Sequence, residues 1–287
     1  MTPMKKLKTI SVLSIAGFDG SGGAGIQADT KTISALGCYA TNVLTALPIQ
    51  NTQGVRNIFE ISPKAIEEQL RAIFDDIYPD AIKIGMVHNT TLVNIIADFL
   101  KDYTGKIVFD PVMVSTSGHR LIDQDTITAC IEKLFPLVDI ITPNLDEVAV
   151  LVGNKIATVE QMEAAGKSLL NMGCQSVLVK GGHLDSDVLT SLLVLQNEPI
   201  LSFHTPKIAT PNTHGSGCTL SSAIATFLAQ KYTLKEAVGK ALDYVHEAIF
   251  HSKDLIIGQG NGPLNHLYAP QKLITYEIST DTKAGNG

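Results

Sequence analysis

Short apolar runs rich in β-branched residues alternate along this chain with segments whose apolar residues recur at helical spacing. The apolar runs are typical of strands buried on both faces and cover 9–17, 81–87, 106–112, 139–144 and 176–183. The helical segments cover 24–36, 63–77, 90–103, 145–153, 160–173, 219–230 and 234–252. A hairpin is expected over 188–205. This alternation predicts an α/β fold whose parallel sheet is covered by helices on both faces.

Composition adds limits on domain organisation and on the classes of partner. The chain has 287 residues, and its first 267 contain no linker rich in Pro, Gly or charge, so we predict one domain over 1–267. Residues 268–287 are expected to be a partly frayed C-terminal extension. The net charge of −6 argues against nucleic acid and membrane surfaces as partners.

Cysteine spacing is informative about metal binding, and the N-terminal sequence is informative about where in the cell the protein is located. The four cysteines are scattered without the spacing of a zinc site or of a disulfide framework. Lysines precede the first apolar run, but the run is short, interrupted by serines and followed by a glycine-rich turn. No stretch reaches the roughly 18 apolar residues of a membrane span. We therefore predict a cytoplasmic protein.

Polar turns follow the predicted strands. Ligands of parallel sheets bind at the carboxyl ends of the strands, so these turns predict the position of a site. They read GFDGSGGAG, GMVHN, DPVMVSTSG, TPNLDE, KGGH and NTHGSGC. Polar turns are also ordinary in any protein, but the number and composition of these favour an active site.

The turn NTHGSGC, residues 212–218, is the most informative of them. Gly215 and Gly217 leave backbone N–H groups free at the start of a long helix, an arrangement that binds anions such as phosphate. Cys218 lies in the first turn of that helix, where a thiol pKa is lowered. The alternative is a small buried cysteine in a glycine-rich helix cap.

The glycine-rich stretch AGFDGSGGAGIQAD, residues 16–29, does not name its ligand by itself. It lacks the Gly-Lys-Ser/Thr ending of a P-loop. Gly20, Gly22 and Gly25 fit the dinucleotide pattern G-x-G-x-x-G, but we find no acidic residue placed to hold a ribose. The stretch shows only that backbone must approach something closely there.

Four more turn residues suit chemistry, each with an ordinary alternative. Asn144 and Glu147 are three residues apart, a spacing that fits either a hydrated Mg²⁺ ion or a helix cap. Asp110 and Lys180 each end a buried strand. A carboxylate at such a position costs stability unless it has a ligand or a partner, and a cation there suits a nucleotide phosphate.

The stretch TALPIQNTQGV, residues 45–55, is expected to contain a further strand, the second along the chain, which ends at Gln50. The Gln50 amide can both donate and accept at the edge of a nitrogen heterocycle. Asn51 or Gln53 would serve as well.

Taken together, these motifs, with QNTQGV and KIGM, closely resemble the hydroxymethylpyrimidine/phosphomethylpyrimidine kinases of thiamine biosynthesis. The resemblance runs in order from about residue 10 to residue 263. It implies a ribokinase-like fold, a three-layer α/β/α sandwich with a central, mostly parallel sheet. It also implies Mg-ATP as phosphate donor, K⁺ as a further candidate cation, a homodimer, and two successive phosphorylations of 4-amino-5-hydroxymethyl-2-methylpyrimidine.

The resemblance also assigns roles to individual positions. Gln50 would hydrogen-bond the pyrimidine, and the opening glycines make room for it. The implied substrate residues are Gln50, Gly17, Asp29, Met86 and Val112. The implied ATP residues are Lys180, Asn144, Thr213 and Ser216, and the implied metal residues are Glu147 and Asp110. Gly215, Gly217 and Cys218 would form the anion hole around the transferred phosphate.

Cys218 stands where the wider sugar-kinase superfamily has an aspartate that acts as general base, and we hypothesise that it is the base here. A pyridoxal kinase, or an enzyme of dual specificity, is the nearest alternative function. A catalytically silent pyrimidine sensor is a third, which the phosphate-transfer residues argue against.

Overall fold

The computed structural model describes residues 6–113, 122–182, 184 and 186–278. The predicted turn after residue 110 lies partly outside this range, as does His183 of the KGGH turn, and the predicted frayed end over 280–287 lies wholly outside it.

In the described ranges, eight strands form the central sheet, in the order β11-β10-β9-β8-β7-β6-β2-β3. In chain order they are β2 (Ser11–Ala16), β3 (Tyr39–Leu44), β6 (Ala81–Ile84), β7 (Lys106–Phe109), β8 (Ile140–Ile141), β9 (Ser176–Lys180), β10 (Val188–Leu195) and β11 (Leu201–Pro206). The six strands from β9 through β8, β7, β6 and β2 to β3 pair in parallel. Strand β10 is antiparallel to both of its neighbours. The predicted mostly parallel sheet and the predicted hairpin are both confirmed.

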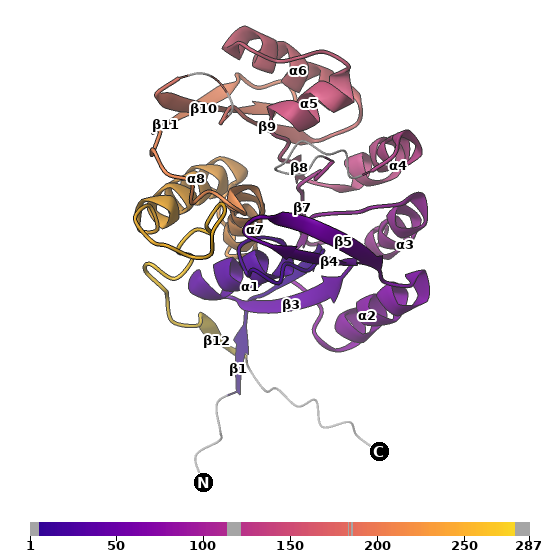
Figure 1. Cartoon of the computed structure of the whole chain (residues 1–287). Helices are drawn as coiled ribbons and strands as arrows, with labels where there is room; N and C mark the ends of the chain where they lie inside the picture. The colour runs from indigo at the N-terminus through magenta and orange to yellow at the C-terminus, as the bar shows by residue number, and fades with distance from the viewer. Residues whose placement is uncertain (1–5, 114–121, 183, 185, 279–287) are drawn as a thin grey trace, which may run out of the picture.

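Helices cover both faces of this sheet, and Figure 1 shows them as two separate sets. One set consists of α1 (Gly25–Ala35), α7 (Ser216–Ala229) and α8 (Leu234–Phe250). The other set consists of α2 (Pro63–Asp76), α3 (Thr90–Leu100), α4 (Gln124–Ala129), α5 (Leu145–Val152) and α6 (Val159–Asn171). A π-helical turn, η1 (Cys130–Leu134), and a 3₁₀ turn, η2 (Phe135–Leu137), follow α4. The predicted α/β/α sandwich is confirmed.

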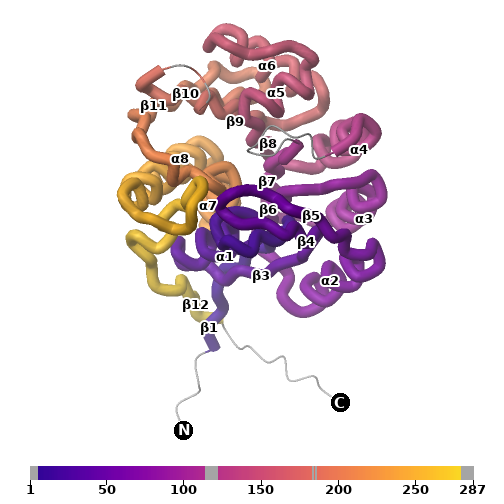
Figure 2. The backbone as a smooth tube through the Cα atoms, viewed as in Figure 1, coloured from indigo at the N-terminus to yellow at the C-terminus, as the bar shows by residue number. Residues whose placement is uncertain are grey.

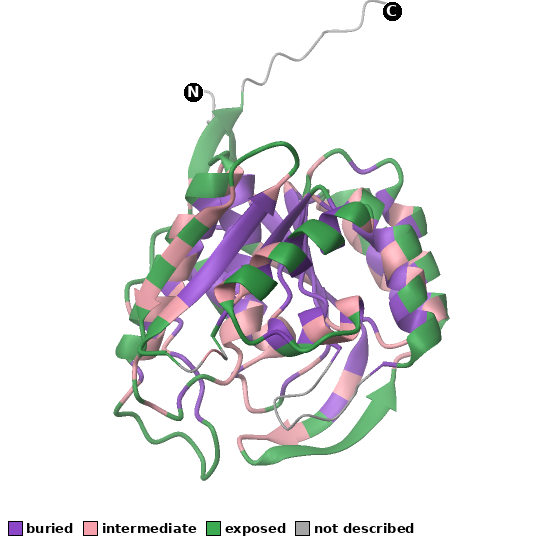
Figure 3. Ribbon diagram, turned by 90° about the horizontal axis from the view of Figure 1, so that it is seen from above, coloured by how far each residue is buried: buried purple, intermediate pink, exposed green. Residues whose placement is uncertain are grey.

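Alternation along the strands supplies one hydrophobic core to each set of helices. Leu13 and Ile15 of β2 pack in the core under α2 to α6, whereas Val12 between them packs under α1, α7 and α8. Successive strand residues point to opposite faces, so a strand buried on both sides reads as a continuous apolar run. Figure 3 shows the result as buried strands between helices whose outer faces are exposed.

Helix ends follow local sequence signals. Ser62 caps α2 by accepting a hydrogen bond from the Ala65 N–H at 3.3 Å, with Pro63 in the first turn. Helix α5 ends at Gly153, whose φ of 76° is the left-handed conformation that glycine adopts at little cost. The predicted helix boundaries differ from the observed ones by up to three residues: α3 ends earlier than predicted, at Leu100, and α7 begins earlier, at Ser216.

Two small sheets stand apart from the central one. Strands β4 (Ala46–Asn51) and β5 (Gly54–Glu60) form a hairpin, and β5 is exposed along its whole length. Strand β1 (Lys6–Thr9) pairs with β12 (Thr275–Ile278), as Figure 2 shows at the end of the molecule from which both termini leave.

These sheets correct two details of the sequence prediction. Gln50 lies on the β4–β5 hairpin, because the second strand of the main sheet, β3, already ends at Leu44. The residues from 268 to 278, expected to be partly frayed, include a paired strand. The helix α4 was not predicted. The single-domain boundary at residue 267 stays a prediction.

Candidate active site

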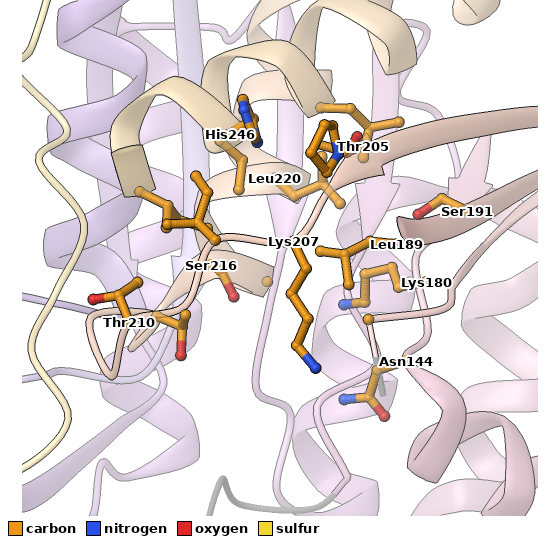
Figure 4. Close-up of a pocket in the computed structure, with 18 residues that line it drawn as sticks. Asn144, Lys180, Leu189, Ser191, Thr205, Lys207, Thr210, Ser216, Leu220 and His246 are labelled. Atoms are coloured by element: carbon orange, nitrogen blue, oxygen red, sulfur yellow. The ribbon is translucent and has the colours of Figure 1, made fainter. Parts of the chain in front are cut away.

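The carboxyl ends of β2, β6, β7, β8 and β9 lie at one edge of the sheet, and the described residues of the predicted polar turns lie along it. A cavity of about 440 Å³ opens at this edge, between α7, α8 and the β10–β11 hairpin. Its polar end contains Lys180, Asn144, Thr213, Ser216 and Gly217. Figure 4 shows the side chains of Lys180, Asn144 and Lys207 around one common space. All four residues predicted to bind ATP line this cavity.

The other end of the cavity is apolar and was not predicted. Its wall consists of Leu189, Pro206, Ile208, Leu220, Leu242, Val245 and Ile249, with His246 among them. These side chains come from β10, from the end of β11 and the chain after it, and from α7 and α8, so no local motif joins them in the sequence. An apolar wall beside a polar end that contains a lysine could accept a purine base together with its phosphates.

The start of α7 separates this cavity from the glycine-rich loop. Gly215 is its N-cap, with φ of 84° and no side-chain cap. A Cβ on Gly215 would stand 1.8 Å from the Gly23 carbonyl oxygen, so only glycine lets the two backbones touch. The first backbone N–H groups of a helix have no helical partner, and Gly217 in this turn lines the cavity. This arrangement fits the predicted anion hole.

Three charged side chains lie beside this turn. Lys180 Nζ donates to Asp110 Oδ1 at 2.9 Å, and both side chains are largely buried. Burial raises the pKa of Asp110, but the charges of Lys180 and Lys83 lower it by more. The net effect is a pKa below the usual value, so the carboxylate stays ionised. Burial also raises the pKa of Glu147 to about 7, against the opposing effect of Lys180.

Asn144 and Glu147 form a complete capping box at the start of α5. Asn144 Oδ1 accepts from the Glu147 N–H at 2.9 Å, and Glu147 Oε2 accepts from the Asn144 N–H at 2.7 Å. The helix-cap alternative is therefore correct for their mutual contacts. Asn144 lines the cavity in addition, whereas Glu147 is not among the lining residues.

The glycine-rich loop is organised by Asp19, a fully buried carboxylate that the sequence interpretation did not single out. Its oxygens accept from the N–H groups of Ser21, Gly23 and Ala24 at 2.7–3.1 Å and from His214 Nε2 at 2.9 Å. Burial raises the pKa of Asp19, but hydrogen bonds from His214, Ser21 and Gln50 hold it well below its usual range. Asp19 thus joins the loop, the NTHGSGC turn and Gln50.

Replacing Asp19 by asparagine is expected to lower the free energy of unfolding at pH 7 by about 2–3 kcal/mol, because several hydrogen bonds to a charge are lost. Since the folded-state pKa is lowered, this stabilisation is present above the unfolded-state value and is lost as pH falls. Urea unfolding should therefore show a gap between wild type and variant that narrows below about pH 4. Asp98→Asn, at an exposed pair on α3, is the control. A gap that is independent of pH would contradict this assignment.

The residues predicted to bind substrate come together in part. The position of a Cβ on Gly17 is 3.8 Å from Met86 Sδ and 3.9 Å from Pro48 on β4, so the loop, the β6 turn and the hairpin meet. Val112 follows Asp110 in the β7 turn. Asp29 lies deeper: its side chain is fully buried and is bonded by Lys83, Ser14 and Ser222. Its predicted contact with substrate stays a prediction.

Cys218 lies in the first turn of α7, and the other three cysteines are buried. The sequence suggested a lowered thiol pKa at this helix start. In the structure, burial raises the pKa of Cys218 to about 11, with the Asp29 and Asp110 carboxylates adding to it and Lys83 opposing. The helix N-terminus is therefore outweighed by burial and by two nearby negative charges.

The fold is an α/β/α sandwich, and one edge of its sheet carries a cation, two carboxylates and a glycine-lined helix start. These features together define a small-molecule kinase. The sequence model described as phosphomethylpyrimidine kinase matches residues 19–265. The chain belongs to this family, as its motifs predicted.

Individual relatives agree with this assignment. The chain is 44% identical over 261 residues to the hydroxymethylpyrimidine/phosphomethylpyrimidine kinase of Rhizobium meliloti, covering 91% of this chain and 98% of that protein. The crystal structure of phosphomethylpyrimidine kinase from Clostridium difficile is 43% identical, with a TM-score of 0.74 over 84% of this chain and 99% of that one. A Bacillus subtilis pyridoxal kinase in complex with ADP is 34% identical, with a TM-score of 0.83 over 90% and 98%.

Proposed function

We propose that this protein transfers a phosphoryl group from ATP to the hydroxymethyl group of 4-amino-5-hydroxymethyl-2-methylpyrimidine, and a second one to the resulting monophosphate. One observation carries the proposal: the first turn of α7 faces the cavity through Gly217 and touches the glycine-rich loop through Gly215. A donor in the cavity and an acceptor over the loop would therefore meet at the same backbone N–H groups.

Each part of the cavity has a role in this reaction. The apolar end would hold adenine, and Lys180 with the α7 turn would hold the phosphates. In the first transfer the substrate oxygen forms a bond to the γ-phosphorus, the bond to the bridging oxygen breaks, and ADP leaves. The hydroxyl proton goes to a base, for which Cys218 is the candidate. Positioning and charge stabilisation supply most of the rate enhancement.

The charges beside the cavity fit a magnesium ion carried by the nucleotide. Among the described residues, no group of three or more His, Cys, Asp or Glu side chains forms a metal cage. Mg²⁺ instead keeps waters and uses one or two carboxylates with substrate phosphates. Burial raises the pKa of Glu147 to about 7 and Asp110 adds to this shift, so a bound cation would favour the ionised form of Glu147. Mg²⁺ would neutralise phosphate charge, and Asp110 and Glu147 are the residues proposed to hold it.

Three other predictions have no test in the structure. No helix in the described residues has the length and apolar character to cross a membrane. The K⁺ requirement, the cytoplasmic location and the homodimer stay predictions.

Product analysis tests the proposed reaction. With ATP, we expect mass spectrometry to detect the pyrimidine monophosphate first and the diphosphate after it. Pyridoxal, run in parallel, tests the alternative that the likeness to pyridoxal kinases raises. Pyridoxal phosphate as the sole product would overturn the substrate assignment, and absence of both products would favour a binding protein.

Gln50→Ala is expected to raise KM for the pyrimidine by about tenfold, because one side-chain hydrogen-bonding group is removed. The KM for ATP should not change, since the ATP cavity is lined by other residues. Gln53→Ala is the matched control on the same hairpin, where Gln53 donates to Gln259 instead. Steady-state kinetics on both variants gives the comparison. A larger effect at Gln53 would show that the heterocycle is held by the other amide.

A further inference from the structure

Four elements of the fold converge on the side chain of Asp29. Lys83 Nζ donates to both of its oxygens, at 2.9 and 2.7 Å, and both side chains are 0% exposed. Ser14 Oγ donates to Oδ2 at 2.5 Å, and Ser222 Oγ donates to Oδ1 at 2.6 Å. Asp29 is on α1, Ser14 on β2, Lys83 on β6 and Ser222 on α7.

This network lies one helical turn below the candidate reaction centre. Asp29 follows Gly25, the first residue of α1, by four residues, and Ser222 follows Cys218 by four. Residues four apart lie on the same face of a helix. The backbone N–H of Gly25 lies near the Cys218 thiol and opposes its raised pKa, so the two helix starts lie close together at this sulfur.

Neither helix start is held by a side-chain cap of its own. The N-cap residues are Ala24 in α1 and Gly215 in α7, and neither makes a side-chain cap bond. Asp19 ties the preceding loops together through His214. Below the first turn, the Asp29–Ser222 bond ties α1 to α7 directly.

Stability alone does not account for a buried ion pair at this place. Removing two charges from water costs energy, and apolar pairs of similar volume are often as stable or more so. A buried polar network that is fully bonded does fix the relative position of the elements it joins.

We propose that Lys83 and Ser222 are positioning residues of the kinase. By holding the Asp29 carboxylate from both sides, they fix α7 against α1 and keep the Cys218 thiol and the α7 N–H groups aligned with the substrate loop. This role rests on the proposed function and gives Asp29 an indirect part in it, beneath the pocket.

A matched pair of serine variants tests the role. Ser222→Ala and Ser14→Ala each remove one hydroxyl from the same carboxylate, but only Ser222 connects it to α7. We expect kcat to fall about tenfold in Ser222→Ala, because small displacements of reacting groups are costly. In Ser14→Ala, kcat should stay within about twofold of wild type, with a similar shift of the urea midpoint in both variants. Equal losses of kcat, or none in Ser222→Ala, would overturn the proposal.

A second measurement needs no substrate. Iodoacetamide should modify Cys218 first, because Cys218 is partly exposed despite the raised pKa of its thiol, whereas the other three cysteines are buried. Its rate, followed by peptide mass, should change severalfold in Ser222→Ala and remain at the wild-type value in Ser14→Ala. If wild type phosphorylated neither heterocycle, the proposed function would fail while this comparison still tested the alignment of the two helices. Equal rates in both variants would count against the positioning role.

Lys83 is tested with its partner replaced as well, because Lys83→Met alone would leave a buried carboxylate uncompensated. The double variant Lys83→Met/Asp29→Leu is expected to fold and to lose about a hundredfold in kcat, with KM for ATP within about threefold of wild type. A folded double variant with wild-type kcat would show that the pair has no role in the reaction.

Discussion

Cys218→Ala is expected to lower kcat for the first phosphoryl transfer by about 10²- to 10⁴-fold, the usual contribution of a general base. The reason is the hydroxymethyl proton, which must leave as the new bond to phosphorus forms. Cys218 stands at the start of α7, beside the Gly25 N–H, where such a proton acceptor is required. Discontinuous assays that separate monophosphate from diphosphate by mass would give the rate of each step.

The second transfer provides an internal control for this assignment. Its nucleophile is a phosphate oxygen, and a phosphomonoester with its second pKa near 6 is largely ionised at neutral pH. No hydroxyl proton has to be removed, so Cys218→Ala should slow the second transfer much less than the first. Equal loss in both steps would mean that the cysteine shapes the anion hole rather than accepting a proton.

The pH dependence gives a further check. Burial raises the pKa of Cys218 to about 11, so at neutral pH the thiol is almost entirely protonated. Below that pKa the thiolate fraction rises tenfold per pH unit, and the wild-type rate of the first transfer should rise with pH between 6 and 9. Cys218→Ala should remove this slope. A variant that kept the slope would place the titrating base elsewhere.

The sequence predicted the main sheet well because buried parallel strands carry a strong local signal. The apolar runs of β2, β6 and β8 are each followed by a helical segment, and this alternation implies parallel pairing. The β4–β5 hairpin has no such signal. Pro48 interrupts β4, and β5 is exposed along its whole length, so neither strand reads as a buried run.

The site was predictable where chemistry and strand ends coincide. Lys180, Asp110 and Asn144 were identified because each ends a strand or follows one, and the fold brings all such ends to one edge. Lys83 stands inside β6, where the sequence shows only a charge in an apolar run. Its significance depends on Asp29, 54 residues earlier, and tertiary structure alone brings the two together.

Opposing effects on the Cys218 thiol explain why its predicted pKa shift was wrong. A helix start lowers a thiol pKa, and this local rule was the basis of the expectation for Cys218. Burial of the thiol raises its pKa, and the carboxylates of Asp29 and Asp110 raise it as well. Both carboxylates are distant from Cys218 in the sequence. The sequence motif names the residue, whereas the balance of charges around it decides its protonation.

Lys180→Met is expected to lower kcat/KM for ATP by at least about a thousandfold, because Lys180 is the buried cation that meets the nucleotide phosphates in the proposed complex. Its Nζ bonds Asp110 at 2.9 Å, and its side chain is 14% exposed, so it lies at the boundary between core and cavity. Removing it leaves the Asp110 carboxylate buried without its main partner, at a cost of about 3–5 kcal/mol in the free energy of unfolding.

The double variant Lys180→Met/Asp110→Asn separates these two consequences. Asparagine removes the uncompensated charge but keeps a group that can bond Thr142, which donates to Asp110 at 2.9 Å. We expect urea unfolding to show that most of the lost stability returns. Steady-state kinetics should show little recovery of kcat/KM for ATP, because no cation has been restored and Asp110, a residue proposed to hold Mg²⁺, has been replaced as well. Recovery of kcat/KM together with stability would instead mean that Lys180 serves the fold, and that the phosphates are held by the α7 turn and by Lys207 at the opposite wall of the cavity.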